Sequence, residues 1–324
     1  MKTKSEVIEM VRAKIRLRHF AYSTEQAYCG WVARYYDFTL GLPRELAPEN
    51  KAERFLSDLA QRLRVAAKTQ NQALAAILFL YEHVMGKPLG KINALRAKQP
   101  KQLRCAPSLD QIRAFRAAVR DTPNTPARLL VDLLYGCGLR VCEPLDLRVK
   151  DILWGENQIS IRDAKGGKDR RVPIPASLRE ALRVQVLRAR HVWEWDRRNA
   201  PAVGVSLPHA LAKKYPTAPF AWQWFWVFPS ANHCAHPRTN ERCRYHLLPD
   251  ALQRVVKQAA TLVGMDGLIT PHVLRHGYAT HLLGAGVDIR TVGELMGHNS
   301  IETTAGYVHP QISRAPNPLD LLAA

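Results

Sequence analysis

The most informative stretch of this sequence is Pro271-His272-Val273-Leu274-Arg275-His276, which places a histidine and an arginine three residues apart. At that spacing the two side chains share one face of a helix. Gly297-His298 and then Tyr307-Val308-His309 follow in the same part of the sequence. A guanidinium, two imidazoles and a phenol gathered in so short a segment indicate a site that binds phosphate and can react with it.

Two segments earlier in the chain add cations to this set. Gly138-Leu139-Arg140-Val141-Cys142-Glu143 follows an apolar run, Leu129 to Tyr135, that predicts a helix. Lys165-Gly166-Gly167-Lys168 lies between two alternating stretches, Ile159 to Arg162 and Arg171 to Ile174. Alternation on both sides of a glycine pair predicts a β-hairpin with these lysines at its tip.

A phosphodiester transfer that conserves bond energy needs a nucleophile, positive charge at the non-bridging oxygens and an acid for the leaving oxygen. Arg140 and Arg275 suit the second role, because a guanidinium fork matches two phosphate oxygens and stays charged. The phenol of Tyr307 can form a covalent phosphoester. Lys165 can protonate the departing 5′ oxygen.

The ordered set Arg, Lys, His-x-x-Arg, Gly-His, Tyr resembles the active site of the tyrosine recombinases, the lambda-integrase family of DNA-cutting and rejoining enzymes. The resemblance implies that His272 and His298 join the arginines and Lys165 at the scissile phosphate. It implies that Tyr307 forms a 3′-phosphotyrosine and that Glu143 supports the first arginine. It also implies no cofactor, neither metal nor ATP, and the sequence holds no Walker loop.

The resemblance implies a mainly α chain with a small β-sheet, in which a helical core-binding domain precedes a mixed α+β catalytic domain. Residues 1–90 show helical spacing of apolar residues and predict a bundle of four helices. Residues 91–107 are basic and broken by prolines, which is typical of a linker. Residues 108–324 then form the catalytic domain.

Local signals predict where several helices start and stop. Capping boxes at Ser23, Ser108 and Ser177 predict helix starts, because the serine hydroxyl can accept from an amide of the first turn. Glycines interrupt the helical pattern of the last part of the chain. They predict breaks at three positions, Gly264, Gly286 and Gly297.

Residues at about 200–245 depart from the general family pattern. The block VGVSLPHALAKKYP and the Trp-rich run after it resemble the insertion of the integron integrases. Trp222, Trp224 and Trp226 alternate, which predicts a strand with three rings on one face. Such rings pack in a core or offer a face on which a base can stack. From the resemblance we favour Trp224 as the base contact.

The same resemblance implies that Pro237, Tyr245 and His246 engage extrahelical bases. Further DNA contacts are expected in the helical domain and the hairpin, at Lys68, Thr69, Gln70 and Lys168. The cluster His233, Cys234, His236, Cys243 and His246 has loose spacing that fits no common zinc finger, so we expect no metal.

Composition agrees with a polyanionic partner. The 324 residues include 47 Lys and Arg against 28 Asp and Glu, a formal net charge of +19. The sequence begins without an apolar signal segment and has no run long enough for a membrane span, so no membrane partner is expected. Six scattered cysteines favour a reducing compartment, the bacterial cytoplasm, with the protein at the nucleoid when it is bound to DNA.

The resemblance therefore implies an integron integrase, a site-specific recombinase that captures and excises gene cassettes. Its expected partners are a duplex integration site and folded single-stranded cassette sites. Four active sites must meet, so we expect a homotetramer on DNA, held by the apolar tail at about 311–324. The alternatives are another tyrosine recombinase of the Xer or phage type, a type IB topoisomerase, or an inactive DNA-binding protein.

Overall fold

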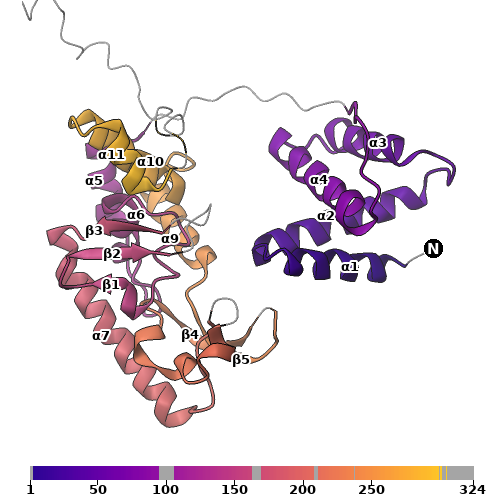
Figure 1. Ribbon diagram of the computed structural model, residues 1–324. Helices are drawn as coiled ribbons and strands as arrows, with labels where there is room; N and C mark the ends of the chain where they lie inside the picture. The colour runs from indigo at the N-terminus through magenta and orange to yellow at the C-terminus, as the bar shows by residue number, and fades with distance from the viewer. Residues whose placement is uncertain are drawn as a thin grey trace, which may run out of the picture. The chain divides into compact units, whose positions relative to one another are not determined.

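The computed structural model describes residues 3–94, 106–162, 169–207, 211–236 and 238–298, together with Ser300 and Thr304. The chain separates into two compact units, Met1–Leu103 and Arg104–Ala324. Helices dominate both units, and the only sheets among the described residues are one of three strands and one of two (Figure 1). The expected mainly α class with a small sheet is confirmed.

The first unit is a helical bundle built around one apolar core. Its helices are α1 (Lys4–Leu17), α2 (Tyr22–Leu40), α3 (Pro48–Gln61) and α4 (Ala67–Phe79), and α4 continues into a π-helical turn (Leu80–Val84). Each helix buries one apolar stripe against the others, as amphipathic helices do. The four predicted helices are therefore present.

Two details of the first unit differ from expectation. The capping box at Ser23 is wrong, because α2 already begins at Tyr22 and its N-cap, Ala21, offers no side-chain acceptor. Leu63 continues the helical spacing of Phe55, Leu56 and Leu59 in the sequence, which predicts a buried position, but it is exposed because the helix ends at Gln61. Both errors lie at helix ends, where a shift of one turn changes which residues face the core.

The second unit places helices around a small antiparallel sheet. Its helices are α5 (Leu109–Ala118), α6 (Ala127–Gly136), α7 (Ala176–Asn199), the short α8 (Leu211–Lys214), α9 (Pro249–Leu262), α10 (Pro271–Gly284) and α11 (Ile289–Met296). The sheet has the order β1 (Ile152–Leu153), β2 (Gln158–Ile161) and β3 (Arg170–Pro173), and the separate hairpin is β4 (Pro229–Ala235) and β5 (Arg242–His246).

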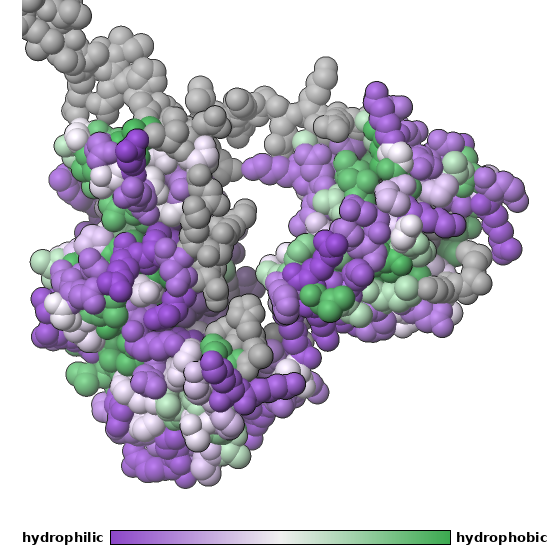
Figure 2. Space-filling view, viewed as in Figure 1, coloured by the Kyte–Doolittle hydropathy of each residue, from purple (hydrophilic) through white to green (hydrophobic). Residues whose placement is uncertain are grey.

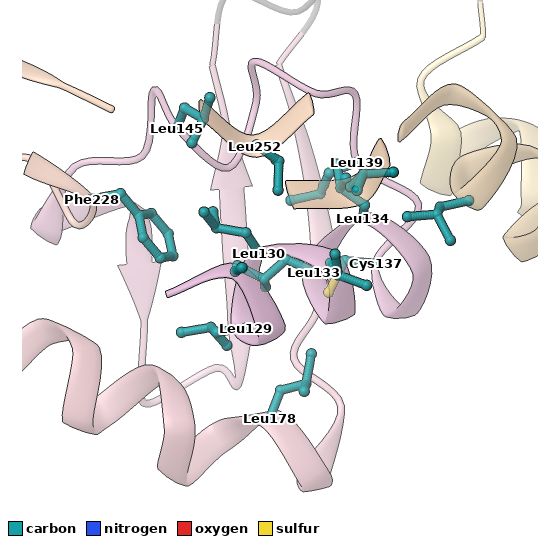
Figure 3. Close-up of a cluster of buried hydrophobic side chains, with 14 of the residues drawn as sticks. Leu129, Leu130, Leu133, Leu134, Cys137, Leu139, Leu145, Leu178, Phe228 and Leu252 are labelled. Atoms are coloured by element: carbon teal, nitrogen blue, oxygen red, sulfur yellow. The ribbon is translucent and has the colours of Figure 1, made fainter. Parts of the chain in front are cut away.

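Helix α6 forms the centre of this unit. Leu130, Leu133 and Leu134 are fully buried, and other helices pack around them (Figure 3). A helix that is apolar on nearly all sides must lie inside a domain. Because α6 is fixed by this packing, the turn that follows it, which carries Arg140, has a rigid base.

Most of the predicted boundaries in this unit agree with the structure. Ser108 and Gln111 form a capping box at the start of α5, and the breaks at Gly264, Gly286 and Gly297 follow α9, α10 and α11, each glycine with a positive φ. Glycine takes that conformation without the strain of a Cβ. The capping box at Ser177 is wrong, since α7 begins at Ala176 after Pro175, with no side-chain cap.

The Trp-rich run is the clearest departure from the predicted secondary structure. Trp222–Trp224 is a 3-10 helix, closed by a hydrogen bond from the Phe225 amide to the Trp222 carbonyl at 2.9 Å. Further 3-10 helices lie at Val149–Asp151 and Ala218–Phe220. Trp226 is buried while the other two rings remain partly exposed, so they do not share one face of a strand.

Polar residues cover most of the visible surface of each unit (Figure 2). Among the described ranges, no helix combines the length and the apolar character needed to cross a bilayer.

Candidate active site

Four segments that are distant in sequence meet at one cluster of charged side chains. The turn after α6 supplies Arg140 and Glu143, the first residue of β3 supplies Arg170, α10 supplies Arg275, and the residue after the α11 cap is His298. Helices α6 and α10 pack on each other, and α11 packs on α10 and on β3. The fold therefore brings together four of the predicted site residues and one arginine that was not predicted.

Glu143 lies at the centre of this cluster. Its carboxylate accepts from the Arg140 amide at 2.7 Å and from Arg140 Nη1 at 2.8 Å. Arg170 donates to both of its oxygens, at 2.9 and 2.6 Å. Burial alone would raise the pKa of Glu143, but the hydrogen bonds and charges of Arg170 and Arg140 outweigh burial and hold that pKa below its usual range.

Arg275 is almost completely buried. It donates from Nη1 to the carbonyl oxygen of Gly138 and from Nη2 to that of Met296, each at 2.5 Å. The same Nη2 lies 3.3 Å from His298 Nε2. The guanidinium thus fastens the turn after α6 to the end of α11. Arg140, whose side chain is 29% exposed, is the more accessible of the two predicted clamp arginines.

His298 is neutral in this arrangement. A guanidinium N–H can only donate, so His298 Nε2 faces Arg275 as an acceptor, and Nδ1 carries the proton toward Thr304 Oγ1 at 2.8 Å. Burial, followed by the positive charges of Arg275, Arg140 and Arg170, lowers the pKa of His298 to about 4. The cluster therefore presents arginine charge beside an uncharged imidazole.

The structure places the remaining predicted catalytic residues in two ways. His272 is exposed in the first turn of α10, one turn before Arg275. Lys165, Lys168 and Tyr307 lie outside the described residues, as does Pro237. Sequence reasoning missed Arg170, because no local signal distinguishes it from the neighbouring Arg171.

The inserted block forms a small aromatic core against α7. Arg148 lies 3.8 Å from the centre of the Trp226 ring and donates to the Trp224 carbonyl at 2.7 Å. The ammonium of Lys150 lies over the Trp224 ring, 2.8 Å from its centre. Burial, followed by the charge of Arg162, lowers the pKa of Lys150 to about 8. Trp224 is therefore a partly exposed ring with a cation on its face.

Tyr245 and His246 belong to the same region. They line an open groove of about 910 Å³ between the β4–β5 hairpin and α9, and the exposed cations Arg254 and Lys257 lie along it. His246 is 5% exposed, with ring nitrogens 2.6 Å from the Leu247 carbonyl and 3.0 Å from Asp146 Oδ1. The ring face expected to meet a base is thus buried, and partly exposed Tyr245 is the more accessible side chain of the pair.

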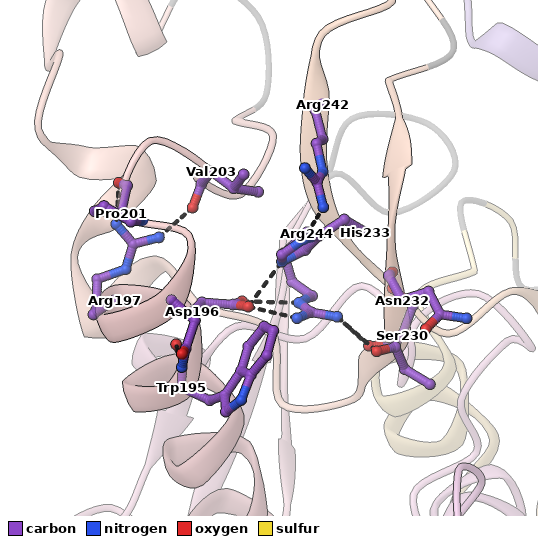
Figure 4. Close-up of polar contacts among 12 residues, drawn as sticks. Trp195, Asp196, Arg197, Pro201, Val203, Ser230, Asn232, His233, Arg242 and Arg244 are labelled. Carbon is purple, nitrogen blue, oxygen red and sulfur yellow. Dashed lines mark hydrogen bonds and ion pairs between the residues drawn. The ribbon is translucent and has the colours of Figure 1, made fainter.

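A buried ion pair fixes the hairpin to α7. Arg244 donates to both oxygens of Asp196, at 2.8 and 2.5 Å, and His233 Nε2 lies 2.8 Å from Asp196 Oδ1 (Figure 4). Cys234 and Cys243 face each other across the two strands. Within the described residues, no group of three His, Cys, Asp or Glu side chains is arranged to hold a metal ion.

The expected DNA contacts of the first unit occupy the start of α4. Lys68 is exposed and Thr69 is half-buried. Gln70 is 4% exposed and donates from Nε2 to the Leu56 carbonyl at 2.9 Å. A buried amide needs such a partner, so in this structure the Gln70 side chain serves the packing of α4 on α3.

Comparisons with known proteins cover nearly the whole chain. Residues 108–314 match the model of the phage integrase family, and residues 7–91 match the N-terminal SAM-like domain of phage integrases. An integrase/recombinase of Escherichia coli is 38% identical over 305 residues, which are 94% of this chain and 89% of that protein. The tyrosine recombinase XerD of Corynebacterium glutamicum is 34% identical over 182 residues, 56% of this chain and 47% of that protein.

Solved structures share the fold at low sequence identity. The Tn1549 transposon integrase in complex with circular intermediate DNA has a TM-score of 0.63 and 15% identity, covering 98% of this chain and 99% of that one. A lambda integrase dimer bound to a core site has a TM-score of 0.61 and 16% identity, covering 97% of each chain.

Proposed function

The chain belongs to the phage integrase family of tyrosine recombinases, and we propose that within this family it acts as an integron integrase. In that role it captures and excises gene cassettes by cutting and rejoining DNA. The observation that carries the proposal is the inserted block between α7 and α9, where Trp224 and Tyr245 pack on one aromatic core beside a groove with basic residues along it.

The proposed reaction is a phosphoryl transfer that conserves one phosphodiester bond. The Tyr307 oxygen attacks phosphorus as its proton passes to the imidazole of His272, and the bond to the 5′ oxygen breaks as Lys165 protonates that oxygen. The product is a 3′-phosphotyrosine and a free 5′ hydroxyl. Attack by the 5′ hydroxyl of a partner strand reverses these steps and rejoins the DNA. Because the energy of the phosphodiester bond is kept in the phosphotyrosine, the reaction needs no cofactor.

Arg140 and Arg275 are proposed to stabilise charge on the non-bridging oxygens. Glu143 holds Arg140 through two hydrogen bonds, so its guanidinium is positioned before the phosphate arrives. Neutral His298 adds no further charge beside the arginines, and His272 lies one turn away on the exposed side of α10. Because Arg275 is buried, we propose that Arg140 makes the first contact with the phosphate.

The proposed substrates are a duplex integration site and folded single-stranded cassette sites. Bases that protrude from a folded strand would stack on Trp224 and Tyr245. Pro237 would contact the same protruding bases. Each stacked base contributes roughly 1–3 kcal/mol. The excess of positive charge, +19 in total, would hold the DNA backbone. Lys68 and Thr69 are proposed to contact the backbone from the helical domain, and Lys168 from the hairpin.

We also propose the domain limits and the assembly. Residues 1–90 would form the core-binding domain, 91–107 the linker and 108–324 the catalytic domain. The tail at about 311–324 would dock on a neighbouring protomer and support a tetramer on DNA. Deleting residues 316–324 should then weaken synapsis more than binding to a single site, as measured by gel mobility of the two complexes.

A recombination assay tests the proposed function. A cassette site is delivered to cells as its top or its bottom single strand, together with a duplex integration site, and recombinants are counted. We expect strong preference for one strand, because only one of them folds with its protruding bases in the recognised arrangement. Equal use of both strands would favour an Xer or phage type recombinase. Relaxation of supercoiled DNA without recombinants would favour a topoisomerase.

A further inference from the structure

Arg170 is a buried arginine to which the roles proposed above assign no function. It is the first residue of β3 and pairs with Ile161, the last residue of β2, so it lies at the end of the β2–β3 ladder that adjoins the connection between the two strands. Lys165 belongs to that connection in the sequence. The Arg170 side chain is 7% exposed. We infer the function of Arg170 from the protein groups that its side chain contacts.

All three guanidinium nitrogens of Arg170 have protein partners. Nη1 and Nη2 donate to the two oxygens of Glu143 at 2.9 and 2.6 Å, and Nε donates to the Leu295 carbonyl at 2.9 Å. A planar fork with this geometry fixes its acceptors in direction as well as in distance. The side chain therefore joins the Arg140–Glu143 turn to the last turn of α11.

The aliphatic part of Arg170 makes a second contact with the His298 segment. Gly297 has a left-handed φ of +61°, and a Cβ at this position would lie 2.9 Å from Arg170 Cδ. The carbonyl of Gly297 lies 3.3 Å from Arg140 Nη2, which donates to it. The backbone just before His298 is thus enclosed between Arg170 and Arg140, and the missing side chain of Gly297 makes room for this packing.

We propose that Arg170 is a positioning residue for strand cleavage, which holds the first residue of β3 in a fixed relation to the segments of Arg140 and His298. The proposal rests on the proposed catalytic roles of Arg140 and His298. Without Arg170, the Glu143 carboxylate would keep Arg140 and the more distant Arg275 Nη1, 3.8 Å away, as its cations. Arg140 would then be drawn toward Glu143 and away from the phosphate, and the start of β3 would lose its hydrogen bonds to Glu143 and Leu295.

The test compares Arg170→Met with Arg171→Met. Arg171 is the next residue of the same strand, but it is exposed and pairs with Glu156 at the surface, so it is a matched control. The probe is a nicked suicide form of the cassette site that recombines in the assay above. We expect single-turnover cleavage by Arg170→Met to fall about 10- to 100-fold, as for other residues that orient active-site groups, while DNA affinity stays within about 3-fold of the control.

A further variant separates positioning from general stability. If Arg170 acts through Glu143, Glu143→Gln combined with Arg170→Met should cleave within about 3-fold of Glu143→Gln alone, because the second change removes a link already lost. Arg170→Lys, which keeps the charge and loses the fork, should cleave at a rate between those of wild type and Arg170→Met. Losses that multiply in the double variant, or an Arg170→Met protein that cleaves as fast as Arg171→Met, would overturn the proposal.

The role of Arg170 can also be tested without DNA, by measuring the pKa of His298 in the free protein. The charge of Arg170 is one of the groups that lower the pKa of His298, after burial and the charges of Arg275 and Arg140. NMR titration should therefore show a higher His298 pKa in Arg170→Met than in Arg171→Met. If wild type cleaves no cassette site, the proposed function fails, and this titration decides the role of Arg170: a raised pKa supports it and an unchanged pKa rejects it.

Discussion

Arg275 donates a hydrogen bond to the carbonyl oxygen of Gly138, 137 residues earlier in the chain. Gly138 has a left-handed φ of +60°, and a Cβ there would lie 2.4 Å from Cδ1 of Tyr278. One backbone carbonyl therefore links α10 to the turn that carries Arg140. This glycine holds the two predicted clamp arginines in a fixed relation.

Gly138→Ala tests that relation. The added methyl meets the Tyr278 ring, and the left-handed backbone is strained, so the carbonyl should move away from Arg275. We expect a loss of about 1–3 kcal/mol of stability and cleavage at least about tenfold slower, measured by thermal unfolding and by single-turnover cleavage. The control is Gly155→Ala, where an added Cβ would have no neighbour within 4 Å. Equal behaviour of the two variants would contradict the prediction.

Arg140→Lys and Arg275→Lys keep the positive charge but lose the planar guanidinium, which can bind two phosphate oxygens at once. We expect both to lower the cleavage rate on the order of 10²-fold or more, as loss of a charge-stabilising donor does. Arg275→Lys should also lower the melting temperature, because it leaves buried carbonyls of Gly138 and Met296 without good donors. Arg140→Lys should melt close to wild type. Near-normal cleavage by both variants would mean that these arginines are structural only.

Tyr307→Phe removes the proposed attacking oxygen and keeps the ring. DNA binding should survive, because no charge changes, while the covalent protein–DNA adduct should vanish. Gel mobility under native conditions measures binding, and a suicide substrate followed by denaturing electrophoresis measures the adduct. An adduct formed by the Phe variant would assign the nucleophile to another residue.

The pKa of His298 predicts a pH dependence of stability. In the unfolded chain a histidine titrates near about 6.5, whereas burial, Arg275, Arg140 and Arg170 lower the folded pKa to about 4. Between these values the unfolded state binds a proton that the folded state does not, so the free energy of unfolding falls as the pH is lowered. Above about pH 6.5 His298 is neutral in both states, so it adds nothing to the pH dependence of the free energy of unfolding.

His298→Gln should therefore unfold in urea with a shallower pH dependence than wild type between about pH 6.5 and about pH 4. At higher pH the difference between the two proteins should stay constant. A wild-type slope in the variant would show that the pKa of His298 is the same in the folded and the unfolded protein.

The sequence predicted those parts of the fold and site that local patterns determine. Apolar periodicity located the helices, and Gly264, Gly286 and Gly297 located breaks, because these signals act within a few residues. The resemblance to the tyrosine recombinases implied that Arg140, Glu143, Arg275 and His298 meet. It could not show that Arg170 joins them, since nothing local distinguishes a buried arginine from the exposed Arg171 beside it.

The inserted block shows the same limit. Alternating tryptophans fit a strand as well as they fit a 3-10 turn, and packing decided between them: Trp222 contacts Trp193 of α7 with ring centres 5.9 Å apart. Gln70 and His246 were expected to meet DNA, yet each is bonded to a backbone carbonyl inside the protein. Burial of polar side chains depends on tertiary neighbours that a single sequence does not display.

Trp224→Ala tests base recognition directly, because its backbone bond to Arg148 does not need the indole. If a base stacks on this ring, losing it costs roughly 1–3 kcal/mol, or about ten- to a hundred-fold in affinity. The loss should appear on the folded single-stranded site, where Lys150 must leave the ring face, and should be much smaller on a paired duplex.

The matched control is Trp222→Ala, whose ring stacks on Phe225 and contacts Trp193. As a packing residue, Trp222 should lower the melting temperature when it is truncated and weaken binding to both DNAs alike, since core aromatic truncation costs about 3–5 kcal/mol of stability. Two affinities and a melting curve for each variant decide the matter. If Trp224→Ala behaves like Trp222→Ala, the ring is a packing residue and the proposed recognition of protruding bases loses its main support.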